Sequence, residues 1–478
     1  MTCSRGRSRA ASWVVGVLFV AALSAASGRW AAAQDGGWSR PELIYETAES
    51  IDTPFLAAGA NGVTHLFWRE SRRDTSDPDV QLEAIFYAND RDGVWSQGRD
   101  VIAMSGLGGP AAAVDSEGVV QLIWHGPNNA LFHSLAGTES ARSAQGWVEP
   151  VTIATANVNA HVVVGEDRAT HVVFPGTDAS GVYYVRYDVA ADVWTSPVAV
   201  SATAANTSSA DYARLAIGPD GTLHVVWTEF LLPQGWPPMG IYYAQSTDDG
   251  ATWSRATELA GENNVQANIA VDSAGRVHVA WNGVVGVGGR YHQWSDDGGL
   301  TWSPVADVVA AGQGGTEGPP QLAIDSADTL HLLSTFSGCA HHAAWRDGAW
   351  TEPVCISGRE AMAGGYIEQP ALTVTNGNEL HAVFWDDRAR LWHTSLTTDA
   401  PFVAPVVPMQ AAPPAVGPQE GTPMAVPEAT PRPTFDLSAA PPAPGGMLAS
   451  PARALLPASA AAAALLALIL LIKMIRSR

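Results

Sequence analysis

The chain has 478 residues, of which 46% are hydrophobic and 15% charged, and its formal net charge is −21. Such an acidic chain is unsuited to binding nucleic acid or anionic membrane surfaces, so both are excluded as partners. It contains 18 tryptophans and 46 glycines, and no long stretch has the periodicity of an amphipathic helix. These features indicate an all-β fold.

The first 33 residues have the features of a secretory signal peptide. Arg5, Arg7 and Arg9 precede the apolar run "ASWVVGVLFVAAL" (11–23), and small residues suited to cleavage follow at 24–26 and 31–33. An uncleaved helical anchor is the alternative. We therefore expect residues 1–33 to direct the rest of the chain out of the cytoplasm.

A unit of about fifty residues repeats seven times between residues 35 and 405. Each copy contains a marker residue in a Gly-x-x-His-x-x-Trp-like motif, preceded by a short apolar strand and followed by an aromatic strand. A polar hairpin and a strand that opens with tryptophan come next. Four strands per repeat, with turn residues between them, are typical of a β-propeller blade. The markers are His65, Gln121, His171, His224, His278, His331 and His381, and the strand-opening tryptophans are Trp95, Trp147, Trp194, Trp253, Trp302 and Trp350.

The seventh copy lacks a strand that opens with tryptophan. The segment "GWSRPELIY" (37–45), which precedes the first copy, has the pattern of "TWSRATELA" (252–260) in the fourth. We predict that this N-terminal strand completes the last blade and closes the ring, which removes exposed sheet edges. The predicted fold is a seven-bladed propeller of four-stranded blades.

The repeated histidines are interpreted as residues of the blade core. Groups at equivalent places around a ring cannot all converge on one ligand, so metal binding is the less favoured interpretation. Cys339, His341 and His342 cannot all point to one face of a strand. We therefore predict neither a metal site nor a cofactor.

A disulfide is expected between Cys339 and Cys355. Cys3 lies in the predicted signal peptide, so these two are the only cysteines of the exported chain, and disulfides persist outside the cytoplasm. If Trp345 pairs with Ala349 across a three-residue turn with a left-handed Gly348, Cys339 lies opposite Cys355.

The C-terminal part of the chain is predicted to be a stalk and a membrane anchor. Fourteen prolines lie between residues 401 and 451, so residues 406–452 should remain extended and disordered. The 19 uncharged residues 454–472 have about the length of a membrane-spanning helix. The basic tail 473–478 favours a cytoplasmic C-terminus, with the ring in the periplasm or at the cell surface.

Two hairpins carry the sequence's clearest family signal, "STDDGATWS" (246–254) and "SDDGGLTWS" (295–303). Both resemble the Asp-box of sialidases and other bacterial neuraminidase repeat proteins. In that family the box is a structural element, in which Ser and Asp fix the turn and Trp packs beneath it. The matching residues here are Ser246, Asp248, Gly250, Trp253, Ser295, Asp297, Gly299 and Trp302.

The resemblance makes exo-sialidase activity an obvious hypothesis. Sialidases hold the sugar carboxylate with three arginines and use a Tyr–Glu nucleophile and an Asp acid/base. The first arginine belongs to an Arg-Ile-Pro motif, but no Arg or Lys occurs between Arg40 and Arg69 in this chain. Seven predicted blades also depart from the six of those enzymes. We therefore predict that the chain is not a sialidase.

Function is sought in the loops that differ between copies, on the face opposite the hairpins. We expect a recognition module for a glycan or for an envelope or surface protein. A sialidase-like glycoside hydrolase and an assembly factor for a membrane complex are the alternatives. The candidate ligand-binding residues are Arg69, Arg72, Arg73, Glu229, Trp236, Tyr366, Glu368, Asp386, Asp387 and Arg388.

Overall fold

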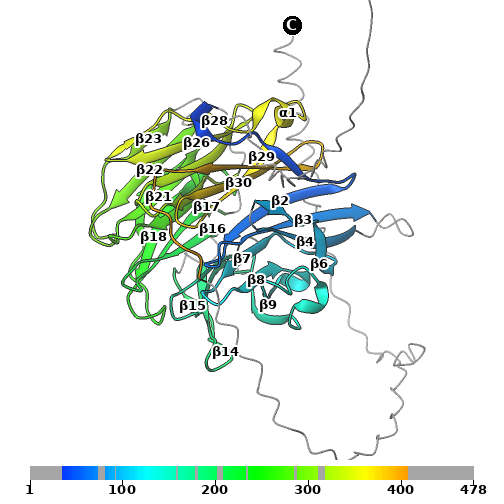
Figure 1. Cartoon of the computed structure of the whole chain (residues 1–478). Coiled ribbons are helices and arrows are strands. Elements are labelled where there is room, and N and C mark those ends of the chain that lie inside the picture. The colour runs from blue at the N-terminus through cyan, green and yellow to red at the C-terminus, as the bar shows by residue number, and fades with distance from the viewer. Residues whose placement is uncertain are drawn as a thin grey trace, which may run out of the picture. The chain divides into compact units, whose positions relative to one another are not determined.

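The computed structural model describes residues 35–73, 81–91, 93–157, 160–177, 181–201, 208–232, 235–284, 288–310 and 318–406. These residues form seven antiparallel sheets arranged around a common axis (Figure 1). In six of the sheets the strand order follows the chain, and in the seventh the N-terminal strand takes the outermost place. The predicted seven-bladed propeller is confirmed.

Blades 1 to 4 occupy the first half of the ring. Blade 1 consists of β2 (Ser50–Ala58), β3 (Thr64–Arg73), β4 (Gln81–Arg91), β5 (Val94–Trp95) and β6 (Arg99–Met104). Blade 2 consists of β7 (Pro110–Val114), β8 (Val119–His125), β9 (Ala130–Gly137) and β10 (Val151–Thr155). Blade 3 consists of β11 (His161–Val164), β12 (Thr170–Pro175), β13 (Val182–Asp188), β14 (Val193–Trp194) and β15 (Val198–Ala199). Blade 4 consists of β16 (Ser208–Ile217), β17 (Leu223–Leu231), β18 (Pro238–Ser246) and β19 (Thr257–Ala260).

Blades 5 to 7 complete the ring. Blade 5 consists of β20 (Asn264–Val271), β21 (Val277–Gly283), β22 (Gly289–Ser295) and β23 (Ala306–Val309). Blade 6 consists of β24 (Gln321–Ile324), β25 (Leu330–Phe336), β26 (Cys339–Arg346), β27 (Ala349–Trp350) and β28 (Val354–Cys355). Blade 7 consists of β29 (Ile367–Thr375), β30 (Glu379–Asp386), β31 (Arg390–Thr397) and β1 (Glu42–Glu46). The helices in the described residues are α1 (Gly358–Met362) and three single turns, η1 (Asp35–Gly37), η2 (Pro127–Asn129) and η3 (Ala144–Gly146).

The N-terminal strand closes the ring as predicted. β1 pairs with β31, so the outermost strand of blade 7 comes from the beginning of the chain. Trp38 is fully buried and its ring meets His342 of blade 6 edge to face, with centroids 5.1 Å apart. The residue therefore has the role in blade 7 that the strand-opening tryptophans have in the other blades.

Each of these seven tryptophans makes an edge-to-face contact with an aromatic ring of the preceding blade. The centroid distances run from 4.9 to 6.0 Å. Edge-to-face geometry places the positive edge of one ring against the negative face of the other, which adds to the burial of both. The pairs are Trp38–His342, Trp95–His393, Trp147–Phe67, Trp194–His133, Trp253–Tyr184, Trp302–Tyr243 and Trp350–His292.

The seven marker residues lie in the blade core, as expected. Each one is buried and hydrogen-bonds a tyrosine or histidine on the third strand of its own blade. Burial lowers the pKa of His65 to about 3 and those of His171 and His224 to about 4, so these rings are neutral near pH 7. The pairs are His65–Tyr87, Gln121–His133, His171–Tyr184, His224–Tyr243, His278–His292, His331–His342 and His381–His393.

The hairpin 246–254 fixes its own turn and then contacts blade 3. Ser246 Oγ accepts from the backbone N–H of Gly250 at 2.9 Å, and Asp248 Oδ1 accepts from that of Thr252 at 2.9 Å. Tyr184 of blade 3 donates its hydroxyl to the turn carbonyl of Asp249. The hairpin 295–303 repeats this arrangement against Tyr243 of blade 4. These residues are therefore turn-forming and blade-joining, with side-chain hydrogen bonds directed into the hairpin itself.

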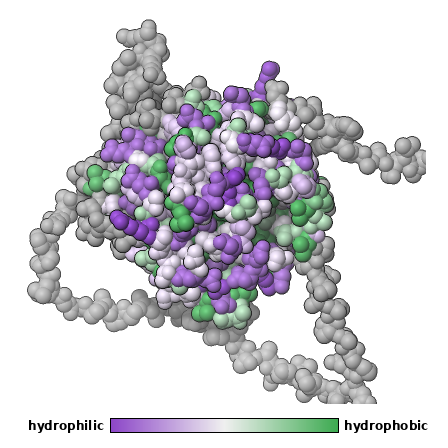
Figure 2. Space-filling view, turned by 90° about the vertical axis from the view of Figure 1, so that its left-hand side faces the viewer, coloured by the Kyte–Doolittle hydropathy of each residue, from purple (hydrophilic) through white to green (hydrophobic). Residues whose placement is uncertain are grey.

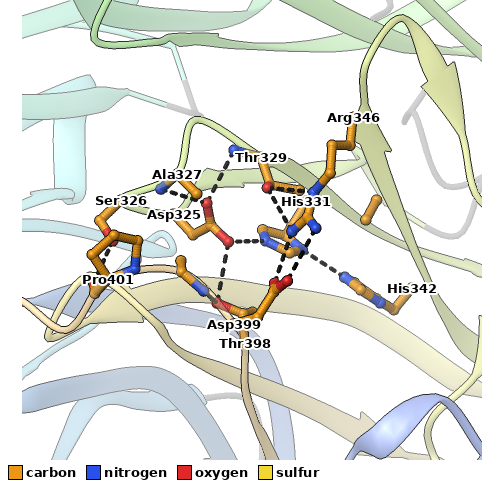
Figure 3. A network of polar contacts seen from close by, with 12 residues as sticks. Asp325, Ser326, Ala327, Thr329, His331, His342, Arg346, Thr398, Asp399 and Pro401 are labelled. Carbon is orange, nitrogen blue, oxygen red and sulfur yellow. Dashed lines mark hydrogen bonds and ion pairs between the residues drawn. The ribbon is translucent and has the colours of Figure 1, made fainter.

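After β31 the chain continues as a strap, residues 398–406, which contacts three blades, and Figure 3 shows its contacts with blade 6. Thr398 donates to Asp325 of blade 6 at 3.2 Å, and Asp399 pairs with Arg346 of the same blade at 3.0 Å. The backbone N–H of Val403 then donates to Asn376 of blade 7, and that of Val406 to Ala60 of blade 1. The strap thus fastens the blades on both sides of the ring closure.

Cys339 and Cys355 form a disulfide, with Cα atoms 5.9 Å apart. The register predicted for them is wrong, because Arg346 rather than Trp345 pairs with Ala349. Asp347 and Gly348 both have positive φ, as a two-residue hairpin turn requires. This turn alone would place Cys355 opposite Ala340, but the register shifts by one more residue between β27 and β28. Cys355 therefore lies opposite His341, and the disulfide runs diagonally between strands.

The predicted signal peptide 1–33, most of the stalk 406–452, the transmembrane helix 454–472 and the tail 473–478 lie outside the described residues. Within the described part of the chain, no helix is both long and apolar enough to cross a membrane. The side of the ring that carries β18, β22 and β23 is mainly hydrophilic, and its hydrophobic residues form small separate clusters (Figure 2).

The contact between hairpin 246–254 and blade 3 can be tested with two glycines of similar φ. A Cβ on Gly250 (φ +81°) would lie 2.0 Å from the Tyr184 ring, whereas one on Gly221 (φ +82°) meets nothing within 4 Å. Both alanine variants incur the left-handed backbone penalty, but only Gly250→Ala also displaces a buried ring. In urea denaturation we expect Gly250→Ala to lose about 1–3 kcal/mol more than Gly221→Ala. Equal losses would show that the hairpin does not hold blade 3.

Candidate functional site

The ring has two faces with different connections. We call hairpin face the side that carries the turns between first and second and between third and fourth strands, including the hairpins 246–254 and 295–303. We call loop face the opposite side, which carries the turns between second and third strands and the connections between blades. The ten candidate residues from the sequence all belong to the loop face.

The arginines of blade 1 do not form an open anion clamp. The guanidinium of Arg69 donates to both carboxylate oxygens of Asp52 and to the carbonyl of Leu107, and it lies 3.6 Å from Glu83. Because two carboxylates already neutralise it, a substrate carboxylate would have to displace them. Arg72 is exposed, and Arg73 is the last residue of β3.

Blade 7 contributes a turn rather than a group of free side chains. Asp386 is fully buried and accepts from Arg390 at 2.6 Å and from the Trp392 indole at 3.0 Å. Its other oxygen accepts from the backbone N–H of Arg388, whose side chain is exposed. These bonds fix the turn between β30 and β31.

Two aromatic side chains of the predicted set are available on the loop face. Trp236 is 49% exposed and Tyr366 is 53% exposed. Tyr366 donates its backbone N–H to the exposed Asp387, so these two residues are brought together. Glu229 accepts from the Trp227 indole at 3.1 Å, and burial raises its pKa. Glu368 is partly buried in β29.

The ten residues thus fall in separate places on blades 1, 4 and 7, and whether they bind a ligand stays a prediction. Neither of the cavities described next is lined by any of them. The structure instead draws attention to the hairpin face, which the sequence analysis treated as purely structural.

A cleft of about 1540 Å³ opens on the hairpin face across blades 7, 1 and 2. Its size exceeds that of most small-molecule sites, which range from roughly 300 to 1,000 Å³. The end of the strap, Pro405 and Val406, forms part of its wall. A second cavity, between blades 4 and 5, measures only about 230 Å³. The uncharged polar side chains that line the cleft are Ser39, Asn61, Thr64, Thr138, Ser140, Asn376, Ser395 and Thr397.

The cleft is acidic. Five carboxylate side chains line it, against the two arginines Arg40 and Arg91. Arg91 forms an ion pair with Glu139, and Arg40 forms one with Glu360 outside the cleft. The cleft is therefore suited to uncharged polar ligands or cations rather than to anions. The carboxylates are Glu42, Asp90, Glu117, Glu139 and Glu379.

Three buried side chains of the cleft form a group whose chemistry is that of a metal site. Asp90 of blade 1 and His381 and His393 of blade 7 each offer one ligand atom, and these atoms lie within 4.8 Å of one another. Burial and the neighbouring His393 lower the pKa of His381 to about 3, which keeps its imidazole neutral. Burial raises the pKa of Asp90, although His393 and the turn N–H groups of Val94 and Gly93 oppose this shift.

This group could not be recognised within any single copy of the repeat, because its residues come from two blades that meet only at the ring closure. Asp90 stands where the hairpins of blades 4 and 5 have Ser246 and Ser295, whereas histidine occupies the position of His393 in blades 2, 5 and 6 as well. Reading across the boundary between blades 7 and 1 would have placed this one departure, Asp90, beside the pair of histidines.

No family model matches the sequence, and a search of curated proteins finds no match. The likeness of the two hairpins to Asp-boxes therefore stays a prediction.

Solved structures with a similar fold include carbohydrate-active and carbohydrate-binding proteins. The BP39L lectin from Burkholderia pseudomallei is 16% identical, with a TM-score of 0.53 over 76% of this chain and 99% of its own. An ulvan lyase bound to a GlcA–Rha3S unit is 12% identical, with a TM-score of 0.51 over 75% of this chain and 96% of its own. The NanB sialidase from Streptococcus pneumoniae is 13% identical, with a TM-score of 0.43 over 75% and 70%. At this identity the likeness shows the propeller fold alone.

The ion pair between Arg69 and Asp52 leads to a prediction about sialidase activity. We expect the purified chain to leave a fluorogenic sialoside uncleaved. Arg69, the candidate arginine for holding a sugar carboxylate, is already paired with Asp52 and lies near Glu83. The measurement is release of the fluorophore relative to a heat-inactivated control. Turnover that disappears in Glu368→Gln or Tyr366→Phe would refute the expectation.

Proposed function

We propose that the chain is an extracytoplasmic propeller that recognises a neutral glycan in the cleft of the hairpin face. The supporting observation is the cleft itself, which combines about 1540 Å³ with a lining of hydroxyl, amide and carboxylate groups. Sugar hydroxyls both donate and accept hydrogen bonds, so such a lining can satisfy them from several directions. The large size suits an oligosaccharide better than a monosaccharide.

The charge of the cleft favours a neutral over an acidic glycan. A sialic acid or uronic acid would bring its carboxylate close to five others, and the two arginines are already engaged. Like charges at short range oppose binding. The lectin and lyase that share the fold add support for carbohydrate as the ligand class, although they show only the fold.

A glycan array followed by calorimetry tests the proposal. We expect binding to neutral but not to acidic oligosaccharides, weakened about 10- to 100-fold in Glu379→Ala, because hydrogen bonds to charged groups are worth roughly 1.5–3 kcal/mol. Trp236→Ala, on the loop face, is the matched control and should bind as the unaltered chain does.

The alternatives give different results in the same experiment. Loss of binding in Trp236→Ala together with full binding in Glu379→Ala would show that the glycan binds on the loop face instead. Binding to none of the glycans would overturn the proposal in favour of a protein partner.

We further propose that residues 406–452 form a stalk and residues 454–472 a single membrane span, with the propeller outside the cytoplasm. The strap supports this arrangement, since it fixes the chain at Val406, where the proline-rich sequence begins.

Protease added to intact cells should release a soluble propeller. Extended proline-rich chain carries few protective hydrogen bonds, so cleavage should fall within 406–452 and spare the ring. The released fragment is identified by mass spectrometry. A ring that stays with the cells after cleavage in this segment would contradict the single anchor.

A further inference from the structure

Asp90, His381 and His393 meet at the boundary between blades 7 and 1, where all three side chains are buried and line the cleft. We propose that these three residues bind one divalent transition-metal ion, with zinc as the metal that fits best. The site would have three protein ligands and an open position towards the cleft, which is the arrangement of zinc sites that also bind water or a substrate.

The two histidines are already spaced as zinc ligands. His381 Nδ1 and His393 Nε2 face each other at 3.2 Å. Two imidazole nitrogens bound tetrahedrally to zinc at 2.0–2.1 Å lie about 3.3 Å apart. A carboxylate oxygen of Asp90 lies within 4.8 Å of one ring nitrogen of each histidine, so the three side chains are close enough to share one ion.

The outer nitrogens of both rings have the second-shell partners usual for metal-bound histidine. Thr375 Oγ1 lies 2.9 Å from His381 Nε2, and Glu42 Oε1 lies 3.3 Å from His393 Nδ1. Because a carboxylate only accepts, His393 carries its proton on Nδ1 and presents the lone pair of Nε2 to the interior. The hydrogen bond between the two rings then runs from His381 Nδ1–H to His393 Nε2, while the Thr375 hydroxyl donates to His381 Nε2. Because that hydroxyl accepts equally well, a shift of the His381 proton to Nε2 would free the lone pairs of both inward nitrogens for a metal ion.

In the His–His pairs of blades 5 and 6 the hydrogen bond between the rings runs in the opposite direction, from the third-strand histidine to the marker. In blade 5 the Trp350 indole donates to His292 Nδ1, so His292 Nε2 carries a proton and donates to His278. In blade 6 Asp325 accepts from His331 Nε2, so His331 Nδ1 accepts from His342. In both blades an ordinary hydrogen bond joins the rings, and it leaves no inward lone pair on the third-strand histidine.

Asp90 is the feature that distinguishes the boundary of blades 7 and 1 from the other six. In each blade, the residue just before the marker pairs with a residue on the third strand. In blade 1 that third-strand residue is Asp90, and no other blade has a carboxylate at this position. Asp90 is only 4% exposed, and among the described residues its Oδ1 atom accepts no hydrogen bond. The other six residues at this register position are Ala136, Tyr187, Ser246, Ser295, Trp345 and Leu396.

A metal ion would satisfy that buried oxygen and offset part of the negative charge of the cleft. The other group of potential ligands, Cys339, His341 and Cys355, has both sulfurs committed to the disulfide. Metal binding can be measured without any glycan, so this inference stands or falls separately from the proposed function.

Substitutions for a test on the purified full chain can be taken from the equivalent positions of other blades. Asp90→Ser installs the residue of blades 4 and 5, and His393→Tyr installs that of blades 1, 3 and 4. His342→Tyr makes the same change in blade 6, beside Leu396 instead of a carboxylate, and is the matched control. Circular dichroism checks that each variant folds.

After chelator treatment, zinc is titrated in competition with a chromophoric chelator, and cobalt spectra report the ligand set. We expect about one zinc per chain in the unaltered protein and in His342→Tyr. Binding should weaken more than about 100-fold in folded Asp90→Ser and His393→Tyr, and about 10- to 100-fold in Glu42→Gln, the range typical of second-shell changes.

Three outcomes would overturn the inference. The first is no zinc bound by the unaltered chain, and the second is equal binding by Asp90→Ser. The third is binding that appears only under reducing conditions and is lost in Cys355→Ser, since it would assign the metal to the cysteines.

Discussion

The fold depends on one contact, the tryptophan edge that each blade sets against an aromatic ring of the blade before it. Among the described residues no backbone hydrogen-bond ladder joins one blade to the next, so side-chain packing must fix the spacing and angle of the blades. The tryptophan lies next to the hairpin. In six of the seven contacts the ring it meets, a tyrosine or a histidine, is hydrogen-bonded to the marker residue of its own blade, and Phe67 is the exception. The contact thereby links the hairpin of one blade to the core of its neighbour.

Because this contact recurs seven times, the places where the recurrence breaks are the candidates for function. Six boundaries place an uncharged residue beside the marker pair, and the boundary of blades 7 and 1 places Asp90 there. The same boundary opens into the cleft and receives both the N-terminal strand and the strap. Repetition thus provides a scaffold, and a single change in it is enough to assemble a chemically distinct site.

The periodic features of the fold could be predicted from the sequence because they are local. The marker histidines, the strand-opening tryptophans and the N-terminal match "GWSRPELIY" each depend on a few neighbouring residues. The register at Cys355 could not be predicted, since it depends on the backbone choice between a two- and a three-residue turn at Asp347 and Gly348 and on a further one-residue shift between β27 and β28. The pairing of Arg69 with Asp52 and the meeting of Asp90 with His393 depend on which strands become neighbours in space. Residues 90 and 393 are joined only when the ring closes.

The closure in blade 7 has a consequence for the order of assembly. Blades 1 to 6 can each form once their own stretch of chain has emerged, but β1 must wait for β31, which is made about 350 residues later. Joining ends so far apart costs roughly 5 kcal/mol in loop entropy, which the buried Trp38, the β1–β31 ladder and the strap must together offset. A product that stops short of β31 would expose the edges of β1 and β30 to other chains. Ring closure therefore depends on a complete chain, because β1 can be paired and covered only after β31 has been made.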